Sequence, residues 1–177
     1  PESNLMLIID ADTHADETEE TWSFLEPEEK HLEPMTLSPA RAGGSEASIK
    51  GYNRYWAIDG QMRVRRVRDD VRTGTIQGVR ELTDIPARLR QMDDLGVDIQ
   101  VIYPSLFLSQ VSARAETEVA LCKAYNRWMA QKFALGGGRL RWVAPLPLLT
   151  MSAALEELEF VAENGACGIL KKGRECG

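Results

Sequence analysis

The sequence has 177 residues, of which 44% are hydrophobic and 27% are charged, and its formal net charge is −6. These values are typical of a globular domain, and the negative charge argues against nucleic acid or an anionic membrane as the main partner. No apolar run approaches the roughly 20 residues of a membrane-spanning helix, and the first residues lack the features of a signal peptide. Three cysteines without a C-x-x-C pair indicate reduced thiols, so we expect a cytoplasmic protein.

The segment from Leu5 to His14 combines an apolar run with alternating polar residues. Residues 5–9 are all apolar, which predicts a strand buried on both faces, as in a parallel sheet. Asp10, Asp12 and His14 then follow at every second position, and residues two apart on an extended chain point to the same face. We therefore expect Asp12 and His14 to direct a carboxylate and an imidazole to one point past the C-terminal end of this strand, where α/β folds bind ligands.

An acidic run, Asp16 to Glu20, follows this motif. For Glu19 and Glu20 the sequence favours the solvated first turn of a short helix, because acids are stabilised near a helix N-terminus. The alternative is a loop over the strand-end site that brings Asp16 or Glu17 near a metal. For Glu17 both interpretations stay open. His31, further along, is predicted to be an exposed histidine and not a ligand.

Residues 15–82 show no pattern of a packed core and are predicted to form a long insertion on the rim of the fold. Within it, residues 55–58 and 61–64 flank the pair Asp59-Gly60, which tolerates the positive φ angles of a tight turn. The insertion therefore contains a predicted β-hairpin. Long ordered loops inside compact domains are usually functional, so this one is a candidate wall of a binding site.

From Thr83 onward, helical and strand patterns alternate. The predicted elements are a helix from Thr83 or Asp84 to Gly96 with Ile85, Leu89, Met92 and Leu95 inward, a strand over 97–104, a helix opened by Ser112 and closed by the glycines at 136–138, a strand over 140–146, a helix opened by Ser152 with Leu155, Leu158 and Val161 inward, and a strand over 166–170. This alternation indicates βαβ crossovers and a parallel sheet. A TIM (β/α)₈ barrel needs about 250 residues, so we predict an α/β fold of the TIM-barrel type with its first four strands only.

Four stretches together resemble the amidohydrolase-related family, the branch of the amidohydrolase superfamily that includes aminocarboxymuconate-semialdehyde decarboxylase. They are Ile9–His14, Met92–Pro104, Ala124–Trp128 and Gly138–Pro147. The resemblance implies a (β/α)₈ barrel with a divalent metal, commonly zinc, at its C-terminal face. Asp12 and His14 match the acid-x-His form of the family's first-strand motif, which implies that they are metal ligands.

The same resemblance implies that the other ligands, histidines after strands 5 and 6 and an aspartate after strand 8, belong to strands outside residues 1–177. On this interpretation the chain is the N-terminal half of one barrel domain, with an insertion at about 15–82. An aspartate in place of histidine makes the site richer in oxygen, which shifts the metal preference from zinc toward manganese or magnesium.

The leading hypothesis is a metal-dependent hydrolase that acts on a small carboxylated substrate through a metal-activated water. Arg54, Tyr55 and Trp56 are expected to help bind the substrate by closing the mouth of the site, and no catalytic residue is assigned. One alternative is a metal-dependent decarboxylase of the same family. Another is an inactive half-barrel whose open edges drive it to form a homo-oligomer or to associate with a C-terminal half. The isolated 177-residue chain is expected to be inactive.

Overall fold

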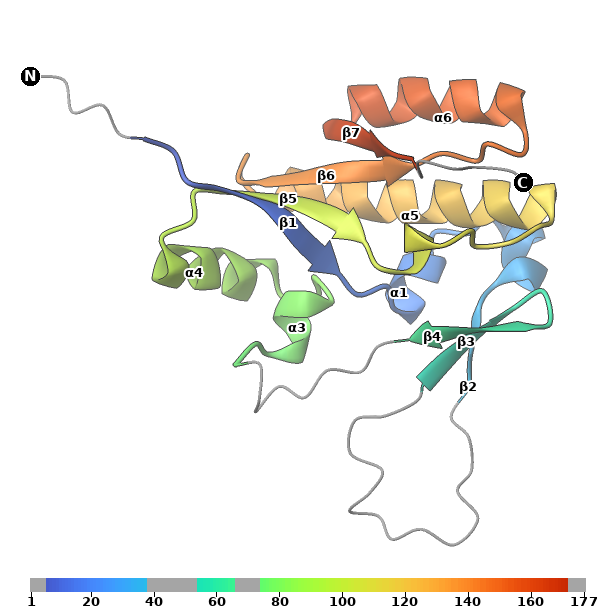
Figure 1. Cartoon of the computed structure of the whole chain (residues 1–177), viewed down its shortest axis with the longest axis horizontal. Coiled ribbons are helices and arrows are strands. Elements are labelled where there is room, and N and C mark those ends of the chain that lie inside the picture. Colours follow the sequence, from blue (N-terminus) through green and yellow to red (C-terminus); the bar gives the residue numbers. More distant parts are fainter. Residues whose placement is uncertain (1–5, 38–53, 66–73, 172–177) are drawn as a thin grey trace, which may run out of the picture.

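The fold is built around a parallel sheet. A computed structural model describes residues 6–37, 54–65 and 74–171, and within them four strands lie side by side (Figure 1). Their order is β1 (Ile9–Ala15), β5 (Ile99–Pro104), β6 (Leu140–Pro145) and β7 (Ala166–Leu170). Because all three pairings are parallel, helices connect the strands: α4 (Ile85–Leu95), α5 (Ala115–Leu135) and α6 (Met151–Glu163). The predicted alternation and the parallel sheet are confirmed.

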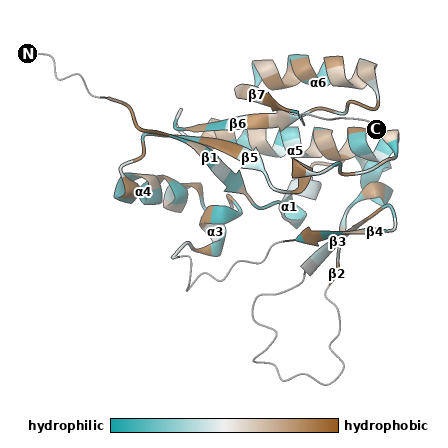
Figure 2. Ribbon diagram, viewed as in Figure 1, coloured by the Kyte–Doolittle hydropathy of each residue, from teal (hydrophilic) through white to brown (hydrophobic). Residues whose placement is uncertain are grey.

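Strand β1 differs from the prediction in its position and its burial. The apolar residues before it were expected to be buried on both faces, but Leu7, Ile8 and Ile9 are exposed and the strand runs on to Ala15. In Figure 2 the chain entering β1 is brown and its C-terminal end is teal. The apolar run lies at the outer edge of the described sheet, where burial on both faces would need further covering elements. Because β1 continues to Ala15, the polar residues Asp10, Asp12 and His14 lie within the strand.

A bulge in β1 changes which of its side chains share a face. Asp10 lies opposite Gln100 of β5, and Thr13 lies opposite Ile102. Between these two pairs β1 therefore contains one more residue than β5. Thr13 and Ala15 consequently face the buried side of the sheet. The bulge interrupts the simple alternation that placed Asp10, Asp12 and His14 on one face. The carboxylate of Asp10 accepts hydrogen bonds from Thr13 and Gln100.

A second, antiparallel sheet stands beside the first. It consists of β2 (Met35–Leu37), β3 (Arg54–Ile58) and β4 (Gln61–Arg65), in that order. The predicted hairpin is confirmed: Asp59 and Gly60 connect β3 to β4 with φ angles of 49° and 73°. The carboxylate of Asp59 accepts hydrogen bonds from Thr117, at 3.0 Å, and from Ser112. These contacts fix the hairpin tip to the start of α5.

The segment before α4 belongs to the core, contrary to the prediction for residues 15–82. It contains α1 (Glu19–Trp22), the 3₁₀ helix η1 (Pro27–Leu32) and α3 (Gln77–Arg80). Trp22 and Trp56 are fully buried, and their rings meet edge to face with centroids 5.7 Å apart. Leu25, Ile58 and Val79 are buried as well. Tryptophan side chains bury large areas, so this segment contributes to the hydrophobic core instead of forming only a rim.

The later helices follow the sequence signals to different degrees. Helix α4 is capped by Asp84, which accepts the Ala87 N–H at 2.8 Å, and it ends at Gly96 with φ of 66°, as predicted. Helix α5 starts at Ala115 and not at Ser112, because the Ser112 hydroxyl contacts Asp59 and the Arg114 N–H. The residues that begin and end α4 are close to it in the sequence. The start of α5, in contrast, depends on the contact of Ser112 with Asp59 of the hairpin.

Helix α6 turns a different face inward than predicted. Leu155 and Leu158 are exposed, whereas Val161 is buried as predicted, together with Ala154 and Glu157. Glu157 accepts hydrogen bonds from Arg127 of α5 at 2.6 and 2.8 Å and from Asn126 at 2.9 Å. The ion pair with α5 therefore sets the rotation of α6.

The two faces of the parallel sheet differ in burial along β5, whereas β6 is buried on both faces after Arg141. On β5 and β6, Ile102, Trp142 and Ala144 are fully buried against the helices. The alternate residues Val101, Tyr103 and Arg141 are only partly buried. β1 and β7 are the outer strands of the described sheet. None of the described helices is long and apolar enough to cross a membrane.

Candidate functional site

A pocket of about 250 Å³ opens where β1 and β5 end. Three parts of the chain line it: the end of β1, the turn after β5, and the antiparallel sheet. The lining residues are His14, Asp16, Glu17, Trp56, Val64, Arg65, Ser105, Leu106, Leu108 and Ser109. The last four belong to the turn that contains the 3₁₀ helix η3 (Leu106–Leu108). The pocket thus occupies the C-terminal edge of a parallel sheet, where α/β folds bind ligands.

His14 lies in this pocket with a defined ring orientation. Its Nδ1 is 3.3 Å from the carbonyl oxygen of Pro104, the last residue of β5. Because a carbonyl oxygen can only accept, Nδ1 carries the proton of this hydrogen bond, and Nε2 of the neutral ring keeps its lone pair. Nε2 lies 3.8 Å from Oδ1 of Asp12. The imidazole of His14 is therefore arranged to act as a base or a ligand through Nε2.

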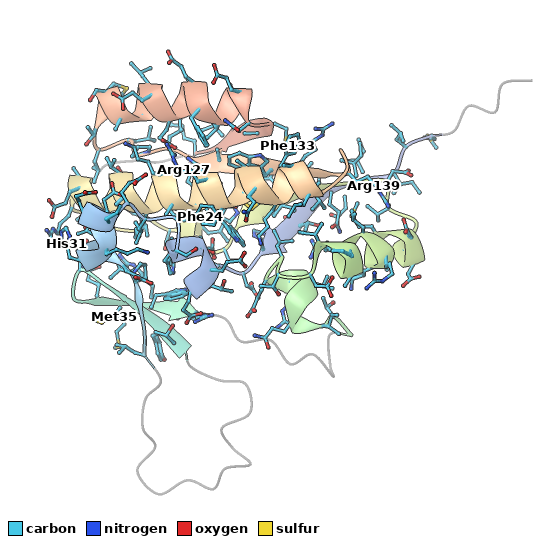
Figure 3. All side chains as sticks on the ribbon, turned by 180° about the vertical axis from the view of Figure 1, so that it is seen from behind. Phe24, His31, Met35, Arg127, Phe133 and Arg139 are labelled. Carbon is cyan, nitrogen blue, oxygen red and sulfur yellow. The ribbon has the colours of Figure 1, made fainter. Side chains whose placement is uncertain are left out.

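Asp12 and His14 supply two donors of suitable spacing for a metal. Two ligand atoms at about 2.1 Å from a tetrahedral ion lie about 3.4 Å apart, so a separation of 3.8 Å needs only a small adjustment. The side chain of Asp12 is 97% exposed, however, and within residues 6–37, 54–65 and 74–171 no group of three potential ligands comes together. These residues alone do not complete a metal site. His31, the other histidine, lies at the outer end of the molecule, exposed as predicted (Figure 3).

The three residues predicted to bind substrate lie on β3, and the structure places them differently. Trp56 lines the pocket and is otherwise buried. Tyr55 is half-buried and points to the opposite face of the strand, so it is absent from the pocket lining. The backbone of Arg54 pairs with Arg65, and its side chain lies outside the described part of the chain. Of the two described side chains in this set, that of Trp56 lies at the pocket.

Arg65 forms the wall beside Trp56. Its guanidinium lies 4.3 Å from the centroid of the Trp56 ring and donates to both carboxylate oxygens of Glu19. These hydrogen bonds lower the pKa of Glu19 to about 2. Glu19 was predicted to be a solvated residue of a first helical turn. It does begin α1, but it also anchors the antiparallel sheet.

Glu17, for which the sequence left two interpretations, is a buried residue of the pocket. Its side chain is 4% exposed. Oε1 accepts the N–H of Ser105 at 2.9 Å, and both oxygens accept the N–H of Leu106 at 3.1 and 3.0 Å. Burial raises the pKa of Glu17 to about 7, against the lowering effect of these hydrogen bonds. The sequence did not distinguish Glu17 from its acidic neighbours, because a run of acidic residues usually indicates a solvated surface.

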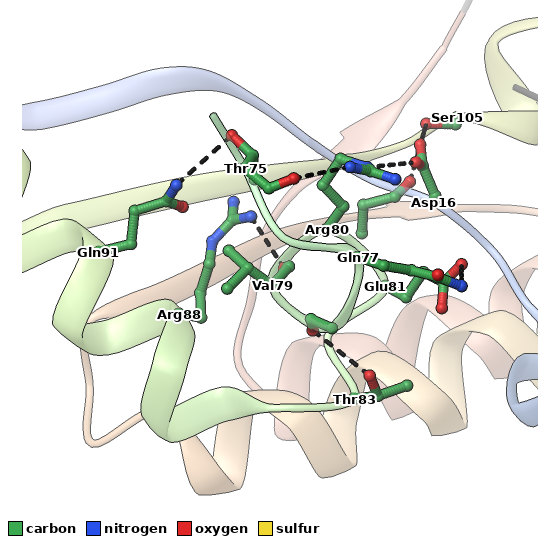
Figure 4. Close-up of polar contacts among 12 residues, drawn as sticks. Asp16, Thr75, Gln77, Val79, Arg80, Glu81, Thr83, Arg88, Gln91 and Ser105 are labelled. Atoms are coloured by element: carbon green, nitrogen blue, oxygen red, sulfur yellow. Dashed lines mark hydrogen bonds and ion pairs between the residues drawn. The ribbon is translucent and has the colours of Figure 1, made fainter. Parts of the chain in front are cut away.

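Asp16 joins the same cluster from the rim side. Its carboxylate contacts Nε of Arg80 at 3.4 Å and the hydroxyl of Ser105 at 3.4 Å (Figure 4). Ser105 also donates to the carbonyl of Ala15 at 2.8 Å. The turns that follow β1 and β5 are therefore tied together. Arg65, which lines the pocket, faces the carboxylate of Glu19, and Arg80, which is outside the lining, faces that of Asp16.

Comparison with known proteins identifies a similar solved structure. No protein-family model matches the chain, and no curated protein matches its sequence. The structure is similar to that of an amidohydrolase from Mycobacterium avium subsp. paratuberculosis K-10, with a TM-score of 0.65 and 17% sequence identity. The match covers 94% of this chain and 50% of that one, so the chain spans about half the length of the amidohydrolase. At this identity the similarity shows the fold. The chain has the fold of part of an amidohydrolase.

Proposed function

We propose that the chain is the N-terminal half of a metal-dependent hydrolase of the amidohydrolase type. The observation that carries this proposal is the orientation of His14. Its Nδ1 contacts the Pro104 carbonyl, which leaves the lone pair on Nε2, 3.8 Å from Oδ1 of Asp12, at the C-terminal edge of a parallel sheet whose fold matches half of an amidohydrolase. In barrel enzymes of this architecture, active sites lie at that edge.

The domain proposal extends this to the rest of a barrel. The four parallel strands would be the first four of eight, and residues 15–82 would be an insertion between the first strand and its helix. Two features support this: the partly buried face of β5, and the position of β1 and β7 at the edges of the described sheet. Open strand edges favour association, so the remaining strands would come from further sequence or from another chain, such as a second copy.

In the proposed site, Asp12 and His14 are two ligands of a divalent metal, with zinc preferred and manganese or magnesium as alternatives. Such a metal lowers the pKa of a bound water and polarises a carbonyl group. The residues of this chain have separate tasks. The Pro104 carbonyl fixes the ring of His14, while Trp56 and Arg65 wall the pocket. The further ligands would come from outside the described residues.

The substrate is proposed to be a small molecule, as the pocket of about 250 Å³ indicates. The expectation of a carboxylated substrate, and that of decarboxylation in place of hydrolysis, remain predictions. A substrate carboxylate would need a cationic partner. Because Arg65 and Arg80 already face carboxylates, that partner would be the metal or a residue outside the described lining.

Metal binding tests the proposal directly. Calorimetric titration with Zn²⁺ and Mn²⁺ is carried out on the wild-type chain, on His14→Ala and on His31→Ala. We expect His14→Ala to weaken Zn²⁺ binding by about 100-fold or more, because it removes a direct ligand. His31→Ala is the matched control, since His31 is exposed and only contacts the Glu28 carbonyl. Identical Zn²⁺ affinity in the His14→Ala and wild-type proteins would contradict the proposed role of His14 as a metal ligand.

Hydrolysis provides the second measurement. A panel of small esters, amides and lactones is incubated with the 177-residue chain, with and without Zn²⁺. We expect no metal-stimulated turnover by this chain alone. Turnover by a longer form or an assembled complex, abolished by His14→Ala, would support the hydrolase. If the 177-residue chain alone shows Zn²⁺-stimulated turnover and His14→Ala abolishes it, the proposal that this chain holds only part of the metal site is wrong.

A further inference from the structure

A single peptide group joins Glu17 to His14. The carbonyl of Pro104 and the N–H of Ser105 belong to that group. The N–H donates to Oε1 of Glu17 at 2.9 Å, and the carbonyl oxygen accepts the Nδ1 proton of His14 at 3.3 Å. The two hydrogen bonds lie on opposite sides of one rigid, planar unit. The result is a chain of hydrogen bonds that runs from a carboxylate, through a peptide group, to an imidazole.

The geometry of this chain is held from several sides. The Leu106 N–H donates to both oxygens of Glu17, so the carboxylate holds two successive peptide groups of the turn after β5. The hydroxyl of Ser105 donates to the Ala15 carbonyl at 2.8 Å and so ties that turn to the end of β1. Glu17 is 4% exposed, so water competes little for its hydrogen bonds. The orientation of the Pro104 carbonyl is therefore tied to Glu17.

We propose that Glu17 is a positioning residue for His14: it fixes the Pro104–Ser105 peptide so that the Pro104 carbonyl retains the proton on Nδ1 and the lone pair stays on Nε2, 3.8 Å from Oδ1 of Asp12. A carboxylate that accepts the peptide N–H also polarises the attached carbonyl and strengthens it as an acceptor. Histidine ligands usually depend on a partner at the second ring nitrogen, which fixes the tautomer and raises the basicity of the ring. In this chain the carboxylate acts on the imidazole through a peptide group. The proposal rests on the proposed function in taking His14 as the site residue.

The tautomer of His14 tests the proposal without any turnover. The ¹⁵N chemical shifts of the two histidine rings are measured by NMR at about pH 8, above the ordinary pKa of a histidine in model peptides, on the full chain without added metal. In the wild-type protein we expect His14 to be mainly the Nδ1–H tautomer. In Glu17→Gln, an amide group replaces one acceptor oxygen with a donor that cannot receive an N–H. The ratio of the Nδ1–H to the Nε2–H form is expected to fall about five-fold.

The chain offers an internal reference and a matched control. His31 contacts the Glu28 carbonyl at 2.8 Å, at the surface, and its tautomer should not change. Glu157→Gln alters an equally buried carboxylate that pairs with Arg127 and is absent from the pocket lining. It should leave the His14 ratio at the wild-type value even if it lowers stability. A general loosening of the fold would move the ratio in both variants.

Two results would overturn the positioning role: an unchanged His14 ratio in Glu17→Gln, or an equal change in Glu157→Gln. If Glu17→Gln does not fold, Glu17→Asp replaces it, because the shorter side chain cannot reach both N–H groups, and the same fall is expected. Failure of the proposed function is separate. If Glu17→Gln lowers the His14 tautomer ratio as expected but His14→Ala leaves the Zn²⁺ affinity unchanged, His14 is not a metal ligand and the positioning role of Glu17 is supported.

Discussion

The guanidinium of Arg65 donates hydrogen bonds to both carboxylate oxygens of Glu19, at 2.6 and 3.0 Å. It also donates to the Thr36 hydroxyl at 2.8 Å and covers the ring of Trp56. One side chain thus connects the last strand of the antiparallel sheet to its first strand and to the start of α1. The wall of the pocket depends on this arginine.

Replacing Arg65 with alanine should loosen that wall. We expect Arg65→Ala to lower the free energy of unfolding by about 1–2 kcal/mol, because a bidentate ion pair is lost while Glu19 is mostly exposed and screened by water. Urea denaturation measures this change, and tryptophan fluorescence should shift to the red as Trp56 becomes hydrated. Arg63→Ala, on the same strand, is the control, because Arg63 donates an exposed hydrogen bond to Gln61 at 2.9 Å. Equal stability of the two variants would contradict the anchoring role.

The stability of the protein should depend on pH through Glu17. Burial raises the pKa of Glu17 from 4.5 to about 7. Folding therefore favours the protonated carboxyl, and this contribution is complete below about pH 4.5 and is lost as the pH rises through about 7. Relative to Glu17→Gln, the free energy of unfolding of the wild-type protein should fall by about 3 kcal/mol between about pH 4.5 and pH 8.

Urea denaturation of both proteins at several pH values measures this difference. The comparison cancels the other titrating groups, which the two proteins share. A wild-type protein that gains stability relative to Glu17→Gln as the pH rises would show that the hydrogen bonds to Ser105 and Leu106 outweigh burial. It would also place the pKa of Glu17 below its ordinary value.

Sequence reasoning succeeded where the determining contacts are local. The Asp84 cap and Gly96 define α4 within a few residues, and Asp59-Gly60 alone specifies the hairpin turn. The start of β1 and the bulge after Asp10 could not be obtained this way, because the pairing with Gln100 and Ile102 of β5 determines them. In the candidate site, the alternation rule brought His14 to the pocket but gave no means of recognising Glu17.

Helix α6 gives a test of an interaction that periodicity concealed. Glu157→Ala should lower the free energy of unfolding by about 3 kcal/mol, because it leaves Arg127 without its carboxylate partner at a buried contact. Leu158→Ala should cost less than about 1 kcal/mol, because Leu158 is exposed. Thermal or urea denaturation of the two variants measures the difference. The reverse order would restore the predicted leucine face of α6.

The reason for the inverted face is the chemistry of α5. An apolar stripe is the best guide when the opposing surface is apolar, but α5 presents Asn126 and Arg127 to α6. A glutamate can face such a surface, where a leucine would deprive the arginine and the amide of a carboxylate acceptor. The inward residue of α6 was therefore fixed by polar groups some thirty positions earlier in the chain. No pattern within α6 itself reports them.

Gly165 makes the connection from α6 to β7 and allows a last prediction. Its φ is 84°, and an added Cβ would collide with the ring of Phe133, a residue of α5 labelled in Figure 3. Gly165→Ala should therefore lower the free energy of unfolding by about 2–4 kcal/mol, from backbone strain and overpacking together. Gly137→Ala is the control: its φ is 57° and an added Cβ meets nothing within 4 Å, so it should cost only about 1 kcal/mol of strain. Denaturation midpoints of the two variants separate the contributions. If both variants lose the same stability, the contact with Phe133 contributes nothing and β7 is positioned by its pairing with β6 alone.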